Sequence, residues 1–231
     1  MPVRPEDLAK TIDHTLLDSN ATAEDVDRLC GEAREHHVAA VCVLPEHVER
    51  AREGLRGCDV KVSAVVGLPH GGQPGREKVA GAEASVSAGA HELGVLMNLE
   101  AMWRFRFPLV REELAAVVHA VRMRSVNSGR GQALVKVIFD GARLDDKLKQ
   151  LACRIVQLVD ADFAEVWHGG TDEALVYEVE LMRERLPERV AVKATAQISS
   201  AGFAHELLAA GAARLGTTDA VALLAGARAL A

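Results

Sequence analysis

The sequence has 231 residues, a hydrophobic fraction of 49% and an aromatic fraction of only 3%, which suits one domain, residues 1–231, with a core built mainly of Ala, Val and Leu. The formal net charge of −6 and the lack of a long basic stretch argue against a nucleic-acid partner. The N-terminal residues have no apolar run typical of a signal peptide, and no segment approaches the ~20 apolar residues of a membrane helix, so we expect a cytoplasmic protein without a membrane partner.

Short segments rich in β-branched residues alternate along the chain with longer segments of helical spacing. The predicted strands are Thr11–Leu16, Ala40–Leu44, Lys61–Gly67, Glu92–Met97, Ala133–Phe139, Phe163–Trp167, Ala191–Thr195 and Arg214–Thr217. The predicted helices are one that opens at Thr22, then Glu46–Leu55, Arg76–Ala88, Val110–Val126, Leu144–Val159, Asp172–Leu186, Ser200–Ala209 and Asp219–Leu230. This alternation is typical of a parallel sheet covered by helices.

Local signals support several of these boundaries. The segment Thr22-Ala23-Glu24-Asp25 has the pattern of a helix-capping box. Gly89 and Gly211 follow predicted helices, at the position where glycine commonly ends a helix. The segment from Ser125 to Gly131 is predicted to be a loop before the fifth strand and not a domain boundary.

Eight strand–helix units in 231 residues favour a closed TIM-type (β/α)8 barrel of the α/β class. An open, doubly wound sheet is the alternative fold. No G-x-G-x-x-G motif follows the first predicted strand, which weakens that alternative.

Polar side chains gather where the predicted strands end, which is where a barrel of this type builds its active site. In chain order they are Asp13, His14, Cys42, His70, Asn98, Lys136, Asp140, Glu165, Trp167, His168, Lys193, Thr195, Thr217, Thr218 and Asp219. Lys136 and Lys193 interrupt apolar strands, where a charge is costly unless it is paired or used.

His70 and His168 are each candidates for a general base near neutral pH, and each can equally be a structural or exposed histidine. Trp167 either forms an apolar wall for a ligand or fills the top of the barrel. No His/carboxylate spacing resembles a metal site and the four cysteines include no C-x-x-C pair, so we expect neither a metal nor a cofactor.

Phrases in nearly every part of the chain resemble deoxyribose-phosphate aldolase. They are Ile12-Asp13-His14-Thr15-Leu16-Leu17, Ala40-Val41-Cys42-Val43, Leu134-Val135-Lys136-Val137-Ile138, Val192-Lys193-Ala194 and Leu215-Gly216-Thr217. The resemblance implies a metal-independent enzyme that joins acetaldehyde to glyceraldehyde 3-phosphate through a Schiff base on a sixth-strand lysine. It also implies a seventh-strand lysine that lowers the pKa of that amine, a fourth-strand aspartate that transfers protons, and a homodimer.

Carried over residue by residue, the resemblance is partial. The seventh-strand lysine matches Lys193 and the fifth-strand lysine matches Lys136. Glu165 stands where the Schiff-base lysine is expected, and Gly94 stands where the aspartate is expected. A carboxylate cannot form an imine, so the reaction that the resemblance implies cannot run through position 165.

The phosphate-binding positions also depart from the family's pattern. The Ser-Gly-Gly turn after the seventh strand appears as Thr195-Ala196-Gln197, and the paired serines after the eighth appear as Thr218-Asp219. Side chains in place of glycines block close backbone approach to an anion, and Asp219 would repel a phosphate. We therefore expect a substrate without a phosphate group.

Glu165 between two lysine-bearing strands is expected to pair with Lys136 and Lys193 and to raise the pKa of Lys193. That is the wrong direction for an amine nucleophile, which must be neutral to attack. The favoured interpretation is a divergent aldolase-like lyase that acts on a small carbonyl compound by acid–base chemistry, with Glu165, Lys193, Lys136 and Asp13 as catalytic residues. The substrate-binding candidates are His70, Asn98, Asp140, Trp167, His168, Thr195, Thr218 and Asp219.

Two other functions stay open. One is a catalytically inactive barrel that binds a ligand, and the other is an aldolase whose Schiff-base amine has moved to Lys193. The high usage of Ala, Arg, Val and Gly is typical of a GC-rich genome, in which a role in specialised metabolism would be plausible.

Overall fold

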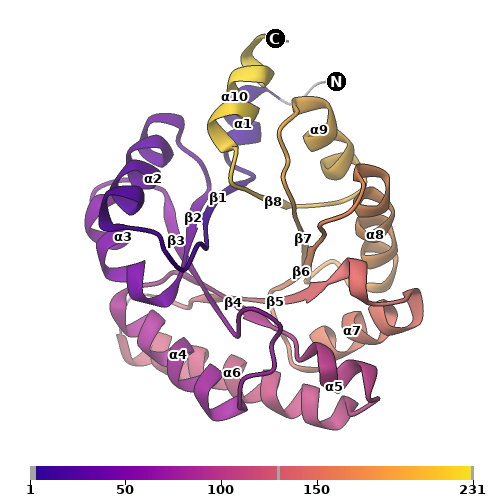
Figure 1. Cartoon of the computed structure of the whole chain (residues 1–231). Helices are drawn as coiled ribbons and strands as arrows, with labels where there is room; N and C mark the ends of the chain where they lie inside the picture. The colour runs from indigo at the N-terminus through magenta and orange to yellow at the C-terminus, as the bar shows by residue number, and fades with distance from the viewer. Residues whose placement is uncertain (1–3, 129–130, 230–231) are drawn as a thin grey trace.

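The computed structural model describes residues 4–128 and 131–229, and its eight parallel strands close into a barrel in chain order (Figure 1). The strands are β1 (Ile12–Leu16), β2 (Ala40–Val43), β3 (Lys61–Val66), β4 (Glu92–Leu96), β5 (Leu134–Asp140), β6 (Phe163–Trp167), β7 (Ala191–Thr195) and β8 (Arg214–Thr217). Pairing of β1 with β8 closes the ring, with Ile12 opposite Leu215. The predicted (β/α)8 barrel is confirmed.

The helices form a ring around the strands (Figure 1). They are α1 (Pro5–Ala9), α2 (Ala23–His36), η1 (Pro45–His47), α3 (Val48–Gly54), α4 (Gly75–Ala88), α5 (Leu99–Trp103), α6 (Phe107–Ser128), η2 (Gly141–Arg143), α7 (Asp146–Leu158), α8 (Asp172–Arg185), α9 (Ala201–Ala209) and α10 (Ala220–Ala229). Among the described residues, no helix is both long and apolar enough to cross a membrane.

The strands are buried on both faces, which explains their small and branched residues. Every residue of β2 is buried, and one large apolar cluster joins the outward faces of the strands to the helices. A second, smaller cluster of Cys42, Val65 and Ile138 is separate from that core. It lies at the carboxyl end of the barrel, where it contributes to the candidate site.

The predicted helix signals are confirmed. Thr22 caps α2 in a reciprocal capping box, because its side chain accepts from the Asp25 backbone N–H and the Asp25 carboxylate accepts from the Thr22 backbone N–H. Gly89 ends α4 in the left-handed region with φ 110°, a conformation that costs glycine little. Gly211 follows α9 with φ 108°.

The predicted loop beginning at Ser125 is wrong, because α6 continues to Ser128. The Ser125 hydroxyl donates to the Val121 carbonyl at 2.7 Å and accepts from the Ala133 backbone N–H at 3.1 Å, so this serine is compatible with a helix. Residues 129 and 130 of that segment, and Leu230 of the last predicted helix, lie outside the described residues. The short helices α1 and α5 were not predicted.

Candidate active site at the carboxyl end of the barrel

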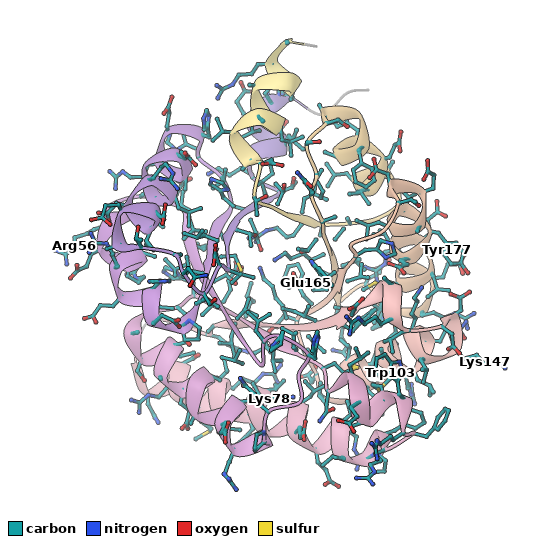
Figure 2. The ribbon with its side chains drawn as sticks, viewed as in Figure 1. Arg56, Lys78, Trp103, Lys147, Glu165 and Tyr177 are labelled. Carbon is teal, nitrogen blue, oxygen red and sulfur yellow. The ribbon has the colours of Figure 1, made fainter. Side chains whose placement is uncertain are left out.

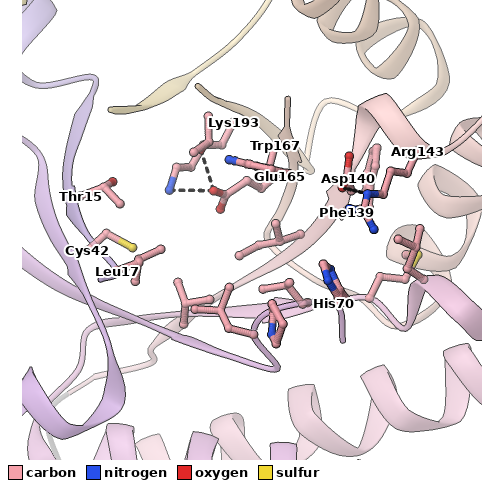
Figure 3. Close-up of a pocket in the computed structure, with 18 residues that line it drawn as sticks. Thr15, Leu17, Cys42, His70, Phe139, Asp140, Arg143, Glu165, Trp167 and Lys193 are labelled. Atoms are coloured by element: carbon pink, nitrogen blue, oxygen red, sulfur yellow. Dashed lines mark hydrogen bonds and ion pairs between the residues drawn. The ribbon is translucent and has the colours of Figure 1, made fainter. Parts of the chain in front are cut away.

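A cavity of about 330 Å³ opens at the carboxyl ends of the strands, and most of its surface is apolar (Figure 3). One wall is the small buried cluster of Cys42, Val65 and Ile138. Leu17, Leu68 and Leu96 pack against that cluster and also line the cavity. Apolar walls with a few convergent polar groups are typical of small-molecule sites.

The polar groups converge on the opposite side, from β6 and β7. Glu165 and Lys193 are direct partners in the register of these strands. Lys193 Nζ lies 3.1 Å from Glu165 Oε1, and the Thr195 hydroxyl donates to the same oxygen at 2.7 Å. The expected pairing of Glu165 with Lys193 is therefore present.

The second oxygen of Glu165 faces the cavity. Among residues 4–128 and 131–229, Oε2 has no hydrogen-bond partner. Other unpaired side-chain atoms are completely enclosed by protein, but Oε2 is not among them. The side chain is 5% exposed and projects into the cavity between Lys193 and the apolar wall (Figure 3). One carboxylate oxygen is thus held by two donors while the other remains available to a ligand.

An ion-pair network fills the barrel directly beneath this pair. Asp13 contacts Lys136 at 2.6 Å and Lys193 at 2.8 Å, and it also contacts Arg214. Glu92 completes the network through Lys136 at 2.5 Å and Arg214 at 3.3 Å. With Glu165 the cluster has three carboxylates and three cations, so its charges balance, as burial at this depth requires.

The network keeps Lys193 protonated. Burial by itself lowers the pKa of the ammonium, but the carboxylates of Asp13 and Glu165 outweigh burial and raise the pKa above its ordinary value. Burial likewise works against ionised Asp13, yet Lys136, Lys193 and Arg214 hold the pKa of that carboxyl well below its usual range. Lys193 is therefore a hydrogen-bond donor in this structure and not an amine nucleophile.

Lys136 and Asp13 are enclosed in the network and do not line the cavity. The expected contact between Lys136 and Glu165 is absent from the described ion pairs, because Asp13 and Glu92 take up the Lys136 ammonium. Cys42 is a neutral part of the apolar wall, since burial raises the pKa of its thiol to about 11. Within the described ranges, no group of three His, Cys, Asp or Glu side chains is arranged to hold a metal ion.

Comparisons with known proteins agree with this architecture. The model of the DeoC/LacD family aldolases matches residues 8–126. A deoxyribose-phosphate aldolase from Streptococcus pneumoniae is 39% identical over 220 residues, which cover 95% of this chain and 96% of the relative. The chain belongs to the DeoC/LacD aldolase family.

Solved structures of this aldolase family superpose closely. The tetrameric deoxyribose phosphate aldolase from Aeropyrum pernix has a TM-score of 0.85 and 29% identity, covering 98% of this chain and 93% of that one. An aldolase named QR15 has a TM-score of 0.84 and 28% identity, covering 95% of each chain. In this family member, β6 contains no lysine, and its inward-facing central residue is Glu165.

The position of the expected fourth-strand aspartate is also tightly packed in this DeoC/LacD member. A Cβ atom on Gly94 would lie 2.8 Å from Ile138 Cδ1 and 3.2 Å from Val65 Cγ2. Both contacts are closer than apolar atoms normally approach. A residue larger than glycine at position 94 would therefore require the Ile138 and Val65 side chains to move.

We predict that Gly94→Ala lowers the free energy of unfolding by about 1–3 kcal/mol, because Ile138 and Val65 must move. Gly94→Asp should cost more, since it also buries a carboxylate in the apolar wall. Urea denaturation followed by fluorescence measures both changes. Gly31→Ala is the matched control: nothing lies within 4 Å of its added Cβ, and alanine in the interior of α2 should stabilise by about 0.5–1 kcal/mol. Equal effects at both glycines would contradict the packing argument.

Four of the predicted binding residues lie around the cavity. Thr195 is next to Glu165, and Trp167 is 47% exposed on the rim. His70 is exposed on the rim, while Asp140 is mostly buried and lies 3.2 Å from Arg143 Nε. These side chains, with Glu165 and Lys193, are the ones that the fold brings together around a ligand space.

The other four lie elsewhere and do not line the cavity. His168 Nδ1 is 2.9 Å from Glu178 of α8, and Asn98 accepts from the Ala101 backbone N–H as the cap of α5. Thr218 is exposed, and Asp219 accepts from Gln197 Nε2 at 3.4 Å. Their predicted role in substrate binding has no support from this arrangement.

Sequence reasoning selected Cys42 but not the other residues of the apolar wall, Val65 and Ile138, and it did not select Arg143. Apolar residues at strand ends cannot be told from core residues by pattern alone. Arg143 follows β5 by only three residues, so its place in a loop at the carboxyl end of the barrel was a usable signal.

Proposed function

We propose that this protein is a divergent aldolase-family lyase that acts on a non-phosphorylated carbonyl compound by acid–base chemistry, with Glu165 as the proton-transferring residue. The observation that carries the proposal is the state of the Glu165 carboxylate. Oε1 is held by Lys193 and Thr195, and Oε2 faces an otherwise mostly apolar cavity. A fixed carboxylate facing a mostly apolar ligand space has the geometry of a general base.

The proposed reaction begins with transfer of the α-proton of a carbonyl compound to Glu165, which leaves an enolate. The Lys193 ammonium has three N–H bonds and, among the residues that the structure describes, contacts two carboxylates, Asp13 and Glu165, so one N–H remains for the enolate oxygen. The enolate carbon then attacks a second carbonyl, and Glu165 returns its proton to the new alkoxide. Cleavage is the reverse sequence, and Asp13 and Lys136 act by keeping Lys193 charged and in place.

The residues at the expected phosphate-binding positions support a substrate without a phosphate group. Thr195 is already committed to Glu165, and Gln197 donates to Asp219, so both side chains at the expected phosphate positions have internal partners. Placing a dianion against the apolar wall would cost several kcal/mol without compensating donors. Metal-independence, a homodimeric state, a cytoplasmic location and a role in specialised metabolism remain part of the proposal as predictions.

The test is exchange of α-protons by non-phosphorylated aldehydes such as propanal and hexanal, measured by proton NMR in deuterium oxide. Enolisation alone gives this signal, so the second substrate need not be known. Glu165→Gln should lower the exchange rate by about 100-fold or more, because the amide keeps the shape but cannot accept the proton. Glu180→Gln on the exposed face of α8 is the control and should leave exchange unchanged. Full exchange in Glu165→Gln would refute the assignment.

Borohydride trapping with acetaldehyde separates the proposal from an imine mechanism. We expect no mass increase on Lys193, because its neighbouring carboxylates keep it protonated. An adduct on Lys193 would instead support an aldolase that uses this amine. If the affinity for the aldehydes rises with their chain length but no aldehyde exchanges its α-protons, the protein is a binding barrel and not a lyase.

A further inference from the structure

A second, more open hollow of about 540 Å³ adjoins the cavity. It reaches outward toward α5, where Gly72, Gln73, Glu100 and Trp103 complete its lining. The cavity and this outer hollow share five lining residues, which form a neck between them: Leu68, Pro69, His70, Leu99 and Arg143. The two spaces are therefore adjacent, and these five residues bound both of them.

The polar groups of the neck are His70 and Arg143 (Figure 3). Arg143 Nε lies 3.2 Å from Asp140 Oδ2, and the Arg143 backbone carbonyl accepts from Trp103 Nε1 at 3.0 Å. These two contacts fix both the side chain and its loop. Within the described part of the chain the Arg143 Nη groups have no hydrogen-bond partner, and the side chain is 48% exposed. The guanidinium is thus anchored through Nε, while its two Nη groups remain available to a ligand.

The charges nearby determine what Arg143 can bind. Glu100, the carboxylate of the outer hollow, already pairs with Arg104 at 2.8 Å. Asp140 balances part of the Arg143 charge without covering its Nη groups. At the far end of the cavity Glu165 repels any anion. An anionic ligand group would therefore lie at the neck, and a single negative charge suits an arginine that is already partly neutralised.

We propose that the neck is a carboxylate-binding subsite, so that the substrate is an oxo acid with an apolar chain between its two functional groups. The carboxylate makes a forked contact with the Arg143 Nη groups beside His70, because a planar carboxylate matches the guanidinium geometry. The chain lies against Cys42, Val65 and Ile138. The placement of the carbonyl at Glu165 rests on the proposed function, whereas the carboxylate contact rests on Arg143 alone.

The side chains around the two spaces offer a direct binding assay. The chain has two tryptophans, and Trp167 lines the cavity while Trp103 lines the outer hollow. Their fluorescence should change when saturated carboxylates of four to ten carbons, which cannot react, are titrated into the wild-type protein. Affinity should pass through a maximum at one chain length, set by the distance from the apolar wall to the neck.

Arg143→Gln should weaken the binding of the best carboxylate by about tenfold or more, since a charge-assisted forked contact is lost. Its methyl ester should bind both proteins equally, because the ester carries no charge. Arg56→Gln, at an exposed arginine on the periphery of the barrel (Figure 2), is the matched control and should change neither affinity. Equal losses for acid and ester in Arg143→Gln, or no binding of any carboxylate to the wild type, would overturn the subsite.

Failure of the subsite and failure of the proposed function give different results. If saturated carboxylates bind through Arg143 but oxo acids show no exchange that depends on Glu165, the subsite stands and the lyase assignment fails. If the α-proton exchange of hexanal depends on Glu165 while Arg143→Gln does not weaken the binding of the oxo acid of the same chain length, the lyase assignment stands and the subsite is wrong. Each combination therefore decides one of the two claims.

Discussion

Asp13→Asn should lower the free energy of unfolding at pH 7 by about 3–5 kcal/mol, the typical cost of removing one partner from a buried ion-pair network. Asp13 is fully buried and contacts the cationic groups of Lys136, Lys193 and Arg214. Asparagine keeps the shape of the side chain but removes its negative charge, so Glu92 and Glu165 are the carboxylates of the network that remain to balance these three cations. The uncompensated buried charge is the cause of the loss, and urea denaturation followed by tryptophan fluorescence measures it.

The pH dependence of this difference has a definite sign. The pKa of Asp13 is lower in the folded protein than in the unfolded chain, where it is about 3.9. Its contribution to stability is therefore fully present above about pH 4 and is lost as the pH falls toward the folded value. The pKa of Lys193 is raised, so the contribution of that ammonium persists up to about pH 10. The difference in unfolding free energy between wild type and Asp13→Asn should be constant from pH 5 to about pH 9 and should narrow as the pH falls below about 4.

Asp7→Asn is the matched control for charge. Asp7 also has a lowered pKa, here because Arg4 donates to it, but this pair is exposed at 2.8 Å near the start of the chain. Solvent screens such a pair, so its removal should leave the denaturation midpoint almost unchanged. If Asp13→Asn and Asp7→Asn lowered the free energy of unfolding by similar amounts, or if Asp13→Asn did not lower it, the buried ion-pair network would not stabilise the fold as argued.

The fold was predictable because each strand and helix has a strong local signal. The eight strands match the predicted ones within one residue at each end, since β-branched runs bounded by helical segments leave little ambiguity. Closure of the sheet followed from the number of units. The short helix α5 was missed because it covers five residues, Leu99–Trp103, which is too few for a periodic pattern.

The centre of the site was predictable for a different reason. Charged residues inside apolar strands are rare, so Lys136, Glu165 and Lys193 stand out in the amino-acid sequence itself. Which of them meet was only partly predictable, because Asp13 and Glu92 decide the partners of Lys136. Of the residues predicted from loops, His70 lines the cavity, whereas Thr218 and His168 do not. The direction of a loop side chain depends on turns that the strand pattern does not encode.

Glu165→Lys should convert a protein that forms no trappable imine into one that does. The new lysine would enter the buried cluster at a position that faces the cavity. It would be the fourth cation, beside Lys136, Lys193 and Arg214, against the two carboxylates of Asp13 and Glu92. Burial and the adjacent Lys193 ammonium both disfavour its charged form, so its pKa should fall and a neutral amine should be present near pH 7.

That amine would attack the carbonyl carbon of acetaldehyde, lose water to give an imine, and be fixed as a secondary amine by borohydride. Peptide mapping by mass spectrometry should find the adduct at position 165 and none at Lys193. Adding Lys193→Met should reduce trapping, because the like charge that lowers the pKa of the new amine is gone. Cleavage of 2-deoxyribose 5-phosphate should still be undetectable, since Gly94 supplies no carboxylate and Ala196 and Gln197 stand where the glycines of the phosphate-binding turn are expected. An adduct on Lys193 in the wild type, or none at position 165 in the folded variant, would show that charge at this position does not control imine formation in this barrel.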